Sequence, residues 1–304
     1  MPNIWTHILF CDELLETINE PSCGEHETYL NLGAQGPDPF FYHNFLPWKK
    51  DKKVNQIGTL LHTEQCGDFL TFLIQKAPQY GEKAKAYVLG FVTHHILDRN
   101  THPYIHYKAG YERNNHQYLE VIIDTIMMNR FRNQDTWKFA VYKEIDVGHK
   151  LDEDVNQLMK EAIQTHFPEA VSNLSPDYVK DSYRDMKRAL MIVSDSTGLK
   201  NVFLSSLISS FSHRPIKEKK DYLGEERNTW YHPATKEPST KSFVDLYEEG
   251  KIEGTEVLKE LLKYWESPTE NQLSKLQALL DDISYDTGTP ASMRHKPIYS
   301  DPIV

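Results

Sequence analysis

The sequence predicts an all-α protein in which a single domain, residues 1–304, folds as a compact bundle of helices. Apolar residues recur at spacings of three and four along most of the chain, as helices with one buried face require. Runs with the alternating pattern of strands are few, and no internal repeat or convincing domain boundary is evident. A length of 304 residues allows one large domain or two modest ones, so the single-domain prediction rests on the missing boundary.

The first part of the chain is predicted to hold three helical pieces and one long loop. Apolar spacing predicts a short amphipathic helix over residues 9–18. Residues 21–50 are rich in Gly, Pro and aromatic residues, which is typical of a structured loop. Two helical pieces follow over residues 54–61 and 69–73, with a break near Gly67.

Two longer helices are predicted in the middle of the chain. The first leads from Ala84 into a run rich in histidine, and Pro103 should end or kink it because proline lacks a backbone N–H. The second runs from about Asn115 to Phe131 on the strength of its apolar stripe.

The later half continues as helices with clearer start signals. Residues 151–163 have helical spacing, and Ser175-Pro176-Asp177 opens the next helix with proline at its first position. Ser267-Pro268-Thr269-Glu270 has the pattern of a capping box. Residues 213–241 are charged and contain proline, which indicates a long surface excursion, and residues 290–304 are predicted to be a poorly ordered tail.

Composition disfavours two classes of protein. The formal net charge of −10 disfavours a protein that binds nucleic acid by net attraction to phosphates. No apolar run approaches the roughly 20 residues needed to span a bilayer. The first residues lack the basic, apolar and small-residue order of a secretory signal, so we expect a cytoplasmic protein. Neither the length nor the composition indicates an oligomeric state.

The most informative stretch runs from His94 to His106 and holds four histidines and an aspartate within thirteen residues. On a helix, His94, Asp98 and His102 lie on one stripe. Such nitrogen and oxygen ligands suit zinc or a hard divalent ion, and burying them without a cation would be costly. His95 points about 100° away from His94, so we expect it to pack or to support the site. His106 could replace His102 if the helix ends early.

Five further residues are candidate ligands. His116 and Glu120 lie one turn apart, and because helix bundles build metal sites from facing helices, we predict that this pair joins the first stripe. His62 is either a ligand or a hydrogen-bonded core histidine. Asp38, in a proline-flanked turn, is either a ligand or an acceptor for backbone N–H groups. His7 is either a ligand or a residue near a helix cap, and spacing alone leaves these alternatives open.

Taken in order, these residues resemble the zinc-dependent phospholipases C of bacteria. The resemblance covers roughly residues 3–125 and follows the order H…PD…H…HxxxDxxxH…HxxxE, which is specific as a whole although each piece alone is weak. The segments that carry it are Trp5-Thr6-His7, Leu32-Gly33-Ala34-Gln35-Gly36-Pro37-Asp38, Leu61-His62, His94-His95-Ile96-Leu97-Asp98 with His102-Pro103, and His116 with Glu120. It implies an all-α bundle with a cluster of two or three zinc ions in a cleft.

The resemblance also implies which residues hold each ion. The first zinc would be held by Asp38, His62, His94 and Asp98, the second by His102, His116 and Glu120, and a third by His7 and Asp98. In secreted members the N-terminal amine and carbonyl also bind the third zinc, whereas Trp5 is internal to this chain, so the third ion is an open point.

The activity that the resemblance implies is hydrolysis of a phosphodiester in a phospholipid-like substrate by a zinc-activated water, with Asp38 as the general base. A rim of exposed aromatic residues could make transient contact with a membrane surface, or the same loop could fold onto the core. The residues concerned are Phe40, Phe41, Tyr42, Phe45 and Trp48.

Two other functions fit the same ligands. One is a nuclease- or nucleotidase-like phosphoesterase, which the acidic balance disfavours because single strands bind in positively charged grooves. The other is a metal-stabilised helical protein with no hydrolytic role, which closed metal coordination would favour because a catalytic zinc needs an open position for water.

Overall fold

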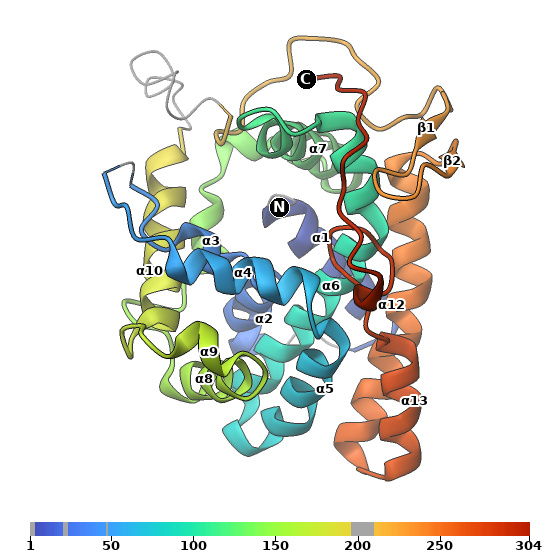
Figure 1. Ribbon diagram of the computed structural model, residues 1–304. Helices are drawn as coiled ribbons and strands as arrows, with labels where there is room; N and C mark the ends of the chain where they lie inside the picture. The colour runs from blue at the N-terminus through green and yellow to red at the C-terminus, as the bar shows by residue number, and fades with distance from the viewer. Residues whose placement is uncertain (1–3, 21–23, 47, 196–209) are drawn as a thin grey trace.

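The computed structural model describes residues 4–20, 24–46, 48–195 and 210–304, and these residues form an all-α fold, as predicted (Figure 1). The long helix α6 (Glu82–Ala109) runs through the middle of the molecule. The helices that pack directly against it include α1 (Ile4–Thr17), α2 (Glu27–Gly33) and α12 (Phe243–Glu266). This arrangement places the histidine run, which lies on α6, at the centre of the bundle.

The remaining helices in the described part of the chain surround this centre. They are α3 (Pro39–Tyr42), α4 (Lys53–Thr63), α5 (Cys66–Lys76), α7 (Asn115–Arg132), α8 (Glu153–His166), α9 (Pro168–Val171), α10 (Tyr178–Val193) and α13 (Glu270–Leu280). Short 3₁₀ turns lie at Gly24–His26, Ala77–Tyr80, Thr136–Lys138, Val141–Lys143 and Ala291–Met293.

Helix α6 continues through Pro103 to Ala109, so of the two predicted alternatives, an end or a kink at this proline, the end is wrong. Proline removes the hydrogen bond that would reach the carbonyl of Arg99. Gly288 of the C-terminal segment packs closely against that carbonyl, and α6 is enclosed by neighbours along most of its length. Tertiary packing thus stabilises a helix that local sequence would interrupt, and it keeps both His102 and His106 on the same helix.

Two glycines allow α2 to lie almost directly on α6. A Cβ atom on Gly33 would overlap the carbonyl of Tyr87, and a Cβ atom on Gly90 would overlap the carbonyl of Leu30. Gly36, which follows α2, has φ of +49° and no room for a side chain beside the ring of His94. Glycine at these positions therefore serves helix packing and the close approach of the chain to a histidine of the predicted site.

Several helix boundaries differ from the predicted ones. The predicted break between α4 and α5 is present, but it lies at residues 64–65, and Gly67 is inside α5. Helix α10 begins at Tyr178 instead of Pro176. At the start of α13 the Thr269 side chain, not that of Ser267, accepts a hydrogen bond from the Gln272 N–H at 3.2 Å.

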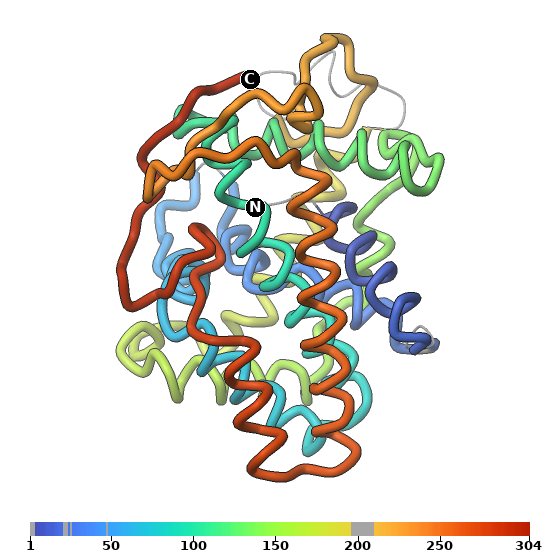
Figure 2. The backbone as a smooth tube through the Cα atoms, turned by 90° about the vertical axis from the view of Figure 1, so that its right-hand side faces the viewer, coloured from blue at the N-terminus to red at the C-terminus, as the bar shows by residue number. Residues whose placement is uncertain are grey.

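Three segments expected to be irregular contain more structure than predicted. The described residues of the 21–50 loop include α2 and α3, and the 213–241 excursion contains a small antiparallel pair, β1 (Trp230–Tyr231) with β2 (Pro238–Ser239). The segment 290–304 is not a poorly ordered tail. It runs along the outside of the molecule (Figure 2), where the N–H groups of Asp301 and Ile303 bond at 2.9 Å to the last carbonyls of α6.

Among the described residues, no helix combines the length and the apolar character needed to cross a bilayer. The cytoplasmic location and the assignment of residues 1–304 to one domain stay predictions.

Candidate metal centre

Helix α6 presents His94, Asp98 and His102 on one buried stripe, as the spacing predicts. Their side chains are between 0% and 2% exposed. Nε2 of His94 lies 3.0 Å from Oδ2 of Asp98, and Nε2 of His102 lies 3.4 Å from Oδ1 of the same carboxylate. Asp98 therefore lies between two imidazoles, with one carboxylate oxygen directed at each.

His7 lies inside α1 and not before it, which corrects the predicted helix start. Its Nε2 lies 3.3 Å from Oδ1 of Asp98, and its ring stacks on that of His94 at 4.1 Å between centroids. Asp124 of α7 fixes the first turn of α1, because its carboxylate accepts hydrogen bonds from the N–H groups of Trp5 at 3.1 Å and Thr6 at 2.9 Å. This contact from α7 positions His7 against α6.

Asp38, in the turn directly before α3, and His62 of α4 reach the same centre. Oδ1 of Asp38 lies 3.5 Å from Nε2 of His62 and 3.8 Å from Nε2 of His94. Asp38 makes no capping hydrogen bond to α3, so the alternative in which it serves the turn backbone is not observed. His62 does bond the core, but only through Nδ1.

The tautomers of two histidines follow from these backbone bonds. Nδ1–H of His62 donates to the Gly58 carbonyl at 2.7 Å, and Nδ1–H of His94 donates to the Ala34 carbonyl at 3.0 Å. In each ring the lone pair is then on Nε2, which faces the carboxylates. Backbone carbonyls thus present both histidines in the form that binds metals.

Helix α7 supplies the last predicted pair. Nε2 of His116 lies 2.7 Å from Oε1 of Glu120, and the same Oε1 lies 3.9 Å from Nε2 of His102. His116 has the most exposed side chain of the predicted ligands, at 20%.

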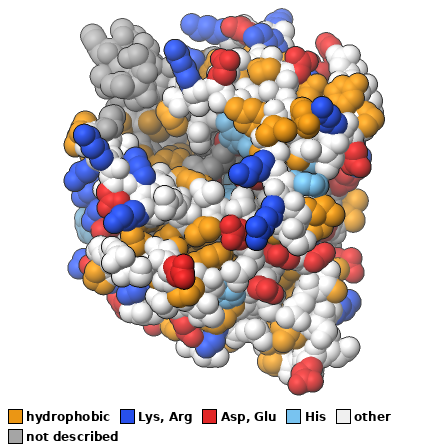
Figure 3. Space-filling view, in the orientation of Figure 1, with side chains coloured by type: hydrophobic (Ala, Val, Ile, Leu, Met, Phe, Trp, Pro, Cys, Tyr) orange, Lys and Arg blue, Asp and Glu red, His pale blue; other side chains and the backbone are white. Residues whose placement is uncertain are grey.

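The face seen in Figure 3 is hollowed near its middle, with histidine side chains in the wall and Lys and Arg side chains at the rim.

The structure therefore brings all eight predicted ligands into one cluster. Within three groups of them, the potential ligand atoms all lie within 4.8 Å of one another. These groups are His7, His94 and Asp98; Asp38, His62 and His94; and His102, His116 and Glu120.

Many buried atoms of this cluster have no hydrogen-bond partner among the described residues. They are both ring nitrogens of His7 and His102, Nε2 of His62 and His94, Oδ1 of Asp38, and both carboxylate oxygens of Asp98. Burying such groups without partners costs about 1–3 kcal/mol each, and more if charged. Imidazole nitrogens and carboxylate oxygens are the ligands of catalytic zinc, so the cluster fits cations of this kind.

Burial and the contacts between carboxylates and imidazoles shift several pKa values of the cluster. Burial alone would raise the pKa of Asp98, but His102, His94 and His7 outweigh burial and hold this pKa well below its ordinary value. Burial lowers the pKa of His7 and raises the pKa of Glu120 to about 7. An ionised Asp98 and a neutral His7 are the forms that bind metals, whereas the raised pKa of Glu120 favours its protonated form when no cation is bound.

Two residues join the cluster that the predicted set did not include. His106, considered only as a substitute for His102, lies on α6 beside it, and Asp286 follows α13. Potential ligand atoms of His102, His106 and Asp286 lie within 4.8 Å of one another. The helical spacing of His102 and His106 could have indicated the first, but no local signal marks Asp286.

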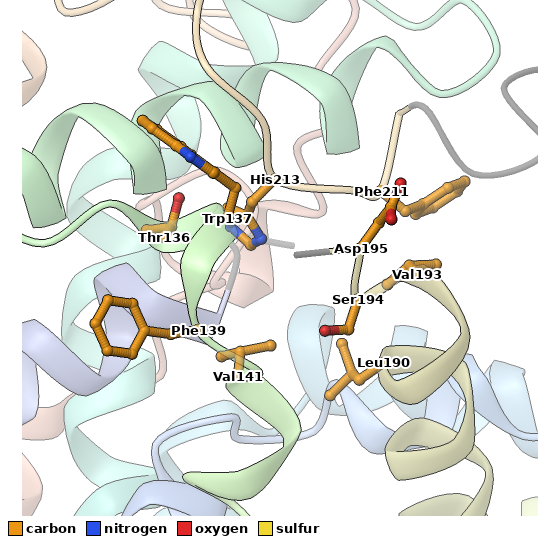
Figure 4. A pocket seen from close by; sticks show the side chains of 10 residues that line it. All are labelled: Thr136, Trp137, Phe139, Val141, Leu190, Val193, Ser194, Asp195, Phe211 and His213. Atoms are coloured by element: carbon orange, nitrogen blue, oxygen red, sulfur yellow. The ribbon is translucent and has the colours of Figure 1, made fainter. Parts of the chain in front are cut away.

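Two other histidines point away from the cluster. Nε2 of His95 bonds the carbonyl of Ile283 at 2.8 Å, so His95 is a supporting residue, as expected. His213 lines a separate pocket between Thr136 and Leu190 (Figure 4), and its Nε2 lies 3.1 Å from Asp124. His213 therefore adds to the contact that holds α1 in place.

The family model for zinc dependent phospholipase C matches residues 6–189, more than half of the chain. The chain belongs to this family. The match extends past the residues 3–125 that carry the recognisable motifs, and it ends before α12, α13 and the C-terminal segment. No curated protein and no solved structure gives a match to this chain. Membership of the zinc dependent phospholipase C family implies a hydrolase for which zinc is the expected metal.

Proposed function

We propose that this protein is a zinc-dependent phosphodiesterase that hydrolyses a phospholipid-like substrate. The observation that supports this proposal is the convergence of eight residues on one buried cluster, in the order of the family motifs. They come from α1, the turn before α3, α4, α6 and α7. The alternative is a protein that metal ions only stabilise. It accounts less well for membership of a hydrolase family and for the partial exposure of His116 to solvent.

The proposed ligand sets follow the three groups of the cluster. Asp38, His62, His94 and Asp98 would hold the first zinc, His102, His116 and Glu120 the second, and His7 with Asp98 would contribute to a third. Bound zinc would supply an activated water and neutralise the phosphoryl oxygens in an in-line displacement.

We assign the general base to Asp38. Its Oδ1 is buried and has no hydrogen-bond partner among the described residues, although it lies within 4 Å of two imidazoles. A carboxylate held there can accept the proton of the attacking water. The ligands that the family resemblance implies also include Asp38. If Asp38 were only a ligand, it would occupy the same position without accepting a proton.

A substrate comparison with a chelator tests the proposed activity. We expect the purified protein to cleave a phosphatidylcholine analogue, to lose this activity with a zinc chelator, and to regain it when zinc is restored. Single-stranded DNA serves as the competing substrate, because net charge disfavours its binding. Faster cleavage of DNA would support the nuclease alternative, and turnover of neither substrate would contradict hydrolysis by this protein.

Of the five aromatic residues that could form a membrane-contacting rim, only Trp48 is strongly exposed. Phe40 is buried, and Phe41, Tyr42 and Phe45 are half-buried, so the loop mostly folds onto the core. Trp48 is 70% exposed. Exposed Lys49 and Lys50 follow it, and a tryptophan beside cations suits the interface of an anionic membrane.

Replacing Trp48 by Ala is therefore expected to weaken binding to vesicles of phosphatidylcholine and phosphatidylserine about fivefold, which corresponds to about 1 kcal/mol of lost apolar burial. Hydrolysis of a soluble short-chain substrate should not change. Vesicle sedimentation measures the binding, and Phe139→Ala, which removes another half-exposed aromatic ring, is the control. Equal vesicle binding by Trp48→Ala and the unaltered protein would contradict the membrane contact.

A further inference from the structure

The segment that follows α13 packs against the metal centre from outside the family match. The N–H of Tyr285 and the Oγ–H of Ser284 both donate to the carbonyl of His62, at 2.9 and 3.2 Å. The carbonyl of Ile283 accepts from His95 at 2.8 Å. These contacts attach residues 283–285 to α4 and α6 on the side of the cluster.

This attachment places Asp286 beside two histidines of α6. Oδ1 of Asp286 lies 3.8 Å from Nδ1 of His102 and 4.0 Å from Nε2 of His106. Nε2 of His102 faces the opposite way, toward Asp98 at 3.4 Å and Glu120 at 3.9 Å. The His102 ring therefore lies between the carboxylates of the cluster and a carboxylate from the C-terminal segment.

Within the described part of the chain, Nδ1 of His102 lacks the backbone hydrogen bond that Nδ1 makes in His62 and in His94. Nδ1 of His62 and of His94 each bonds a carbonyl, which fixes Nε2 as the free nitrogen. Nδ1 of His102 is buried and has no hydrogen-bond partner among the described residues. A histidine that ligates a metal usually donates its other N–H to a carboxylate or a carbonyl, and Asp286 is the carboxylate that faces this nitrogen.

We propose that Asp286 is the positioning residue for His102: it accepts the Nδ1–H of His102 and so directs Nε2 toward the second zinc, which the proposed function assigns to His102, His116 and Glu120. The inference rests on that proposed metal centre. The 3.8 Å separation requires a small rotation of either side chain to reach hydrogen-bond distance. A C-terminal segment outside the family match thereby acts on a ligand of the family motif.

The test measures zinc affinity and not turnover. We expect Asp286→Ala to weaken the binding of one zinc about 10- to 100-fold, as for other carboxylates that orient a ligating histidine, while the total number of bound ions at saturation stays the same. Competition with a chromogenic chelator gives the affinity, and the absorption spectrum of the cobalt-substituted protein reports the ligand field. Asp286→Glu should restore much of the affinity, because the gap to His102 leaves room for one methylene group.

Two variants control for general effects on the segment. Asp282→Ala removes the side chain that accepts from the Gly67 N–H at 3.2 Å, and so loosens the segment without touching a histidine. Asp301→Ala removes an exposed negative charge further along the same segment. Both should keep the zinc affinity and the cobalt spectrum of the unaltered protein.

Three outcomes would overturn the inference: unchanged zinc affinity in Asp286→Ala, an equal loss in Asp282→Ala, or one fewer bound ion at saturating zinc, which would make Asp286 a direct ligand. Because no substrate is used, the inference and the proposed function can fail separately. A zinc affinity that depends on Asp286 in a protein that cleaves no phosphodiester would leave the inference standing and the proposed function refuted.

Discussion

Replacing Asp98 by Ala is expected to lower kcat/KM on a phosphatidylcholine analogue by about 10³-fold or more. Asp98 contacts His7, His94 and His102 through its two carboxylate oxygens, so it belongs to two of the proposed zinc sets. Metal ions supply several kcal/mol of transition-state stabilisation, and each 1.4 kcal/mol is a factor of ten in rate. Steady-state kinetics with zinc in excess, together with metal analysis of the variant, measure the effect.

A buried carboxylate away from the centre provides the matched control. Asp185 is 8% exposed and accepts a hydrogen bond from the Asn44 N–H at 3.0 Å. Asp185→Ala should lose stability but keep kcat/KM within a few-fold and retain its zinc. If Asp98→Ala retained full zinc content and activity, the cluster would not be the site of hydrolysis.

Removing the metal ions is expected to destabilise the folded protein by several kcal/mol and to lower its melting temperature by about 10 °C. Without cations, Nε2 of His62, Nε2 of His94 and both carboxylate oxygens of Asp98 are buried with no hydrogen-bond partner among the described residues, and each such group costs about 1–3 kcal/mol. For a domain of this size, 1 kcal/mol shifts the melting temperature by roughly 2–4 °C. Calorimetry of the zinc-loaded and chelator-treated protein measures the difference.

Two further measurements make this second prediction specific to the cluster. Zinc added back to the chelated protein should restore the melting temperature, because binding to the folded state alone stabilises it. The chelator should shift Asp98→Ala much less, since that variant has lost a shared ligand. A melting temperature that the chelator does not change would contradict metal binding at this site.

The centre of the predicted site came from local sequence because helix periodicity fixes it. His94, Asp98 and His102 are four residues apart, and any α-helix through them places their side chains on one stripe. The pair His116 and Glu120 follows from the same rule. The family motifs then indicated the order of the remaining residues, and the structure brings those residues to the same cluster.

Local sequence patterns gave wrong boundaries where a segment distant in the chain makes the stabilising contact. Pro103 does not end α6, because neighbouring segments enclose the helix and Gly288 packs on the carbonyl that the proline leaves unbonded. The start of α1 lies ahead of the predicted one, and Asp124, more than a hundred residues later, bonds its first turn. The segment 290–304 is ordered by bonds to carbonyls of α6, which its own polar sequence does not reveal.

Periodicity and side-chain chemistry are properties of residues close together in the chain, so they were enough to predict the helical class, the stripe on α6 and the chemical kind of ligand. Long-range packing sets which nitrogen of His62 and of His94 faces the cluster, and it places Asp286 beside His102. Both depend on partners such as the carbonyls of Gly58 and Ala34 and the packing of the C-terminal segment on α4 and α6. Burial makes those partners obligatory, because a polar atom removed from water must find its hydrogen bond or its cation within the folded chain.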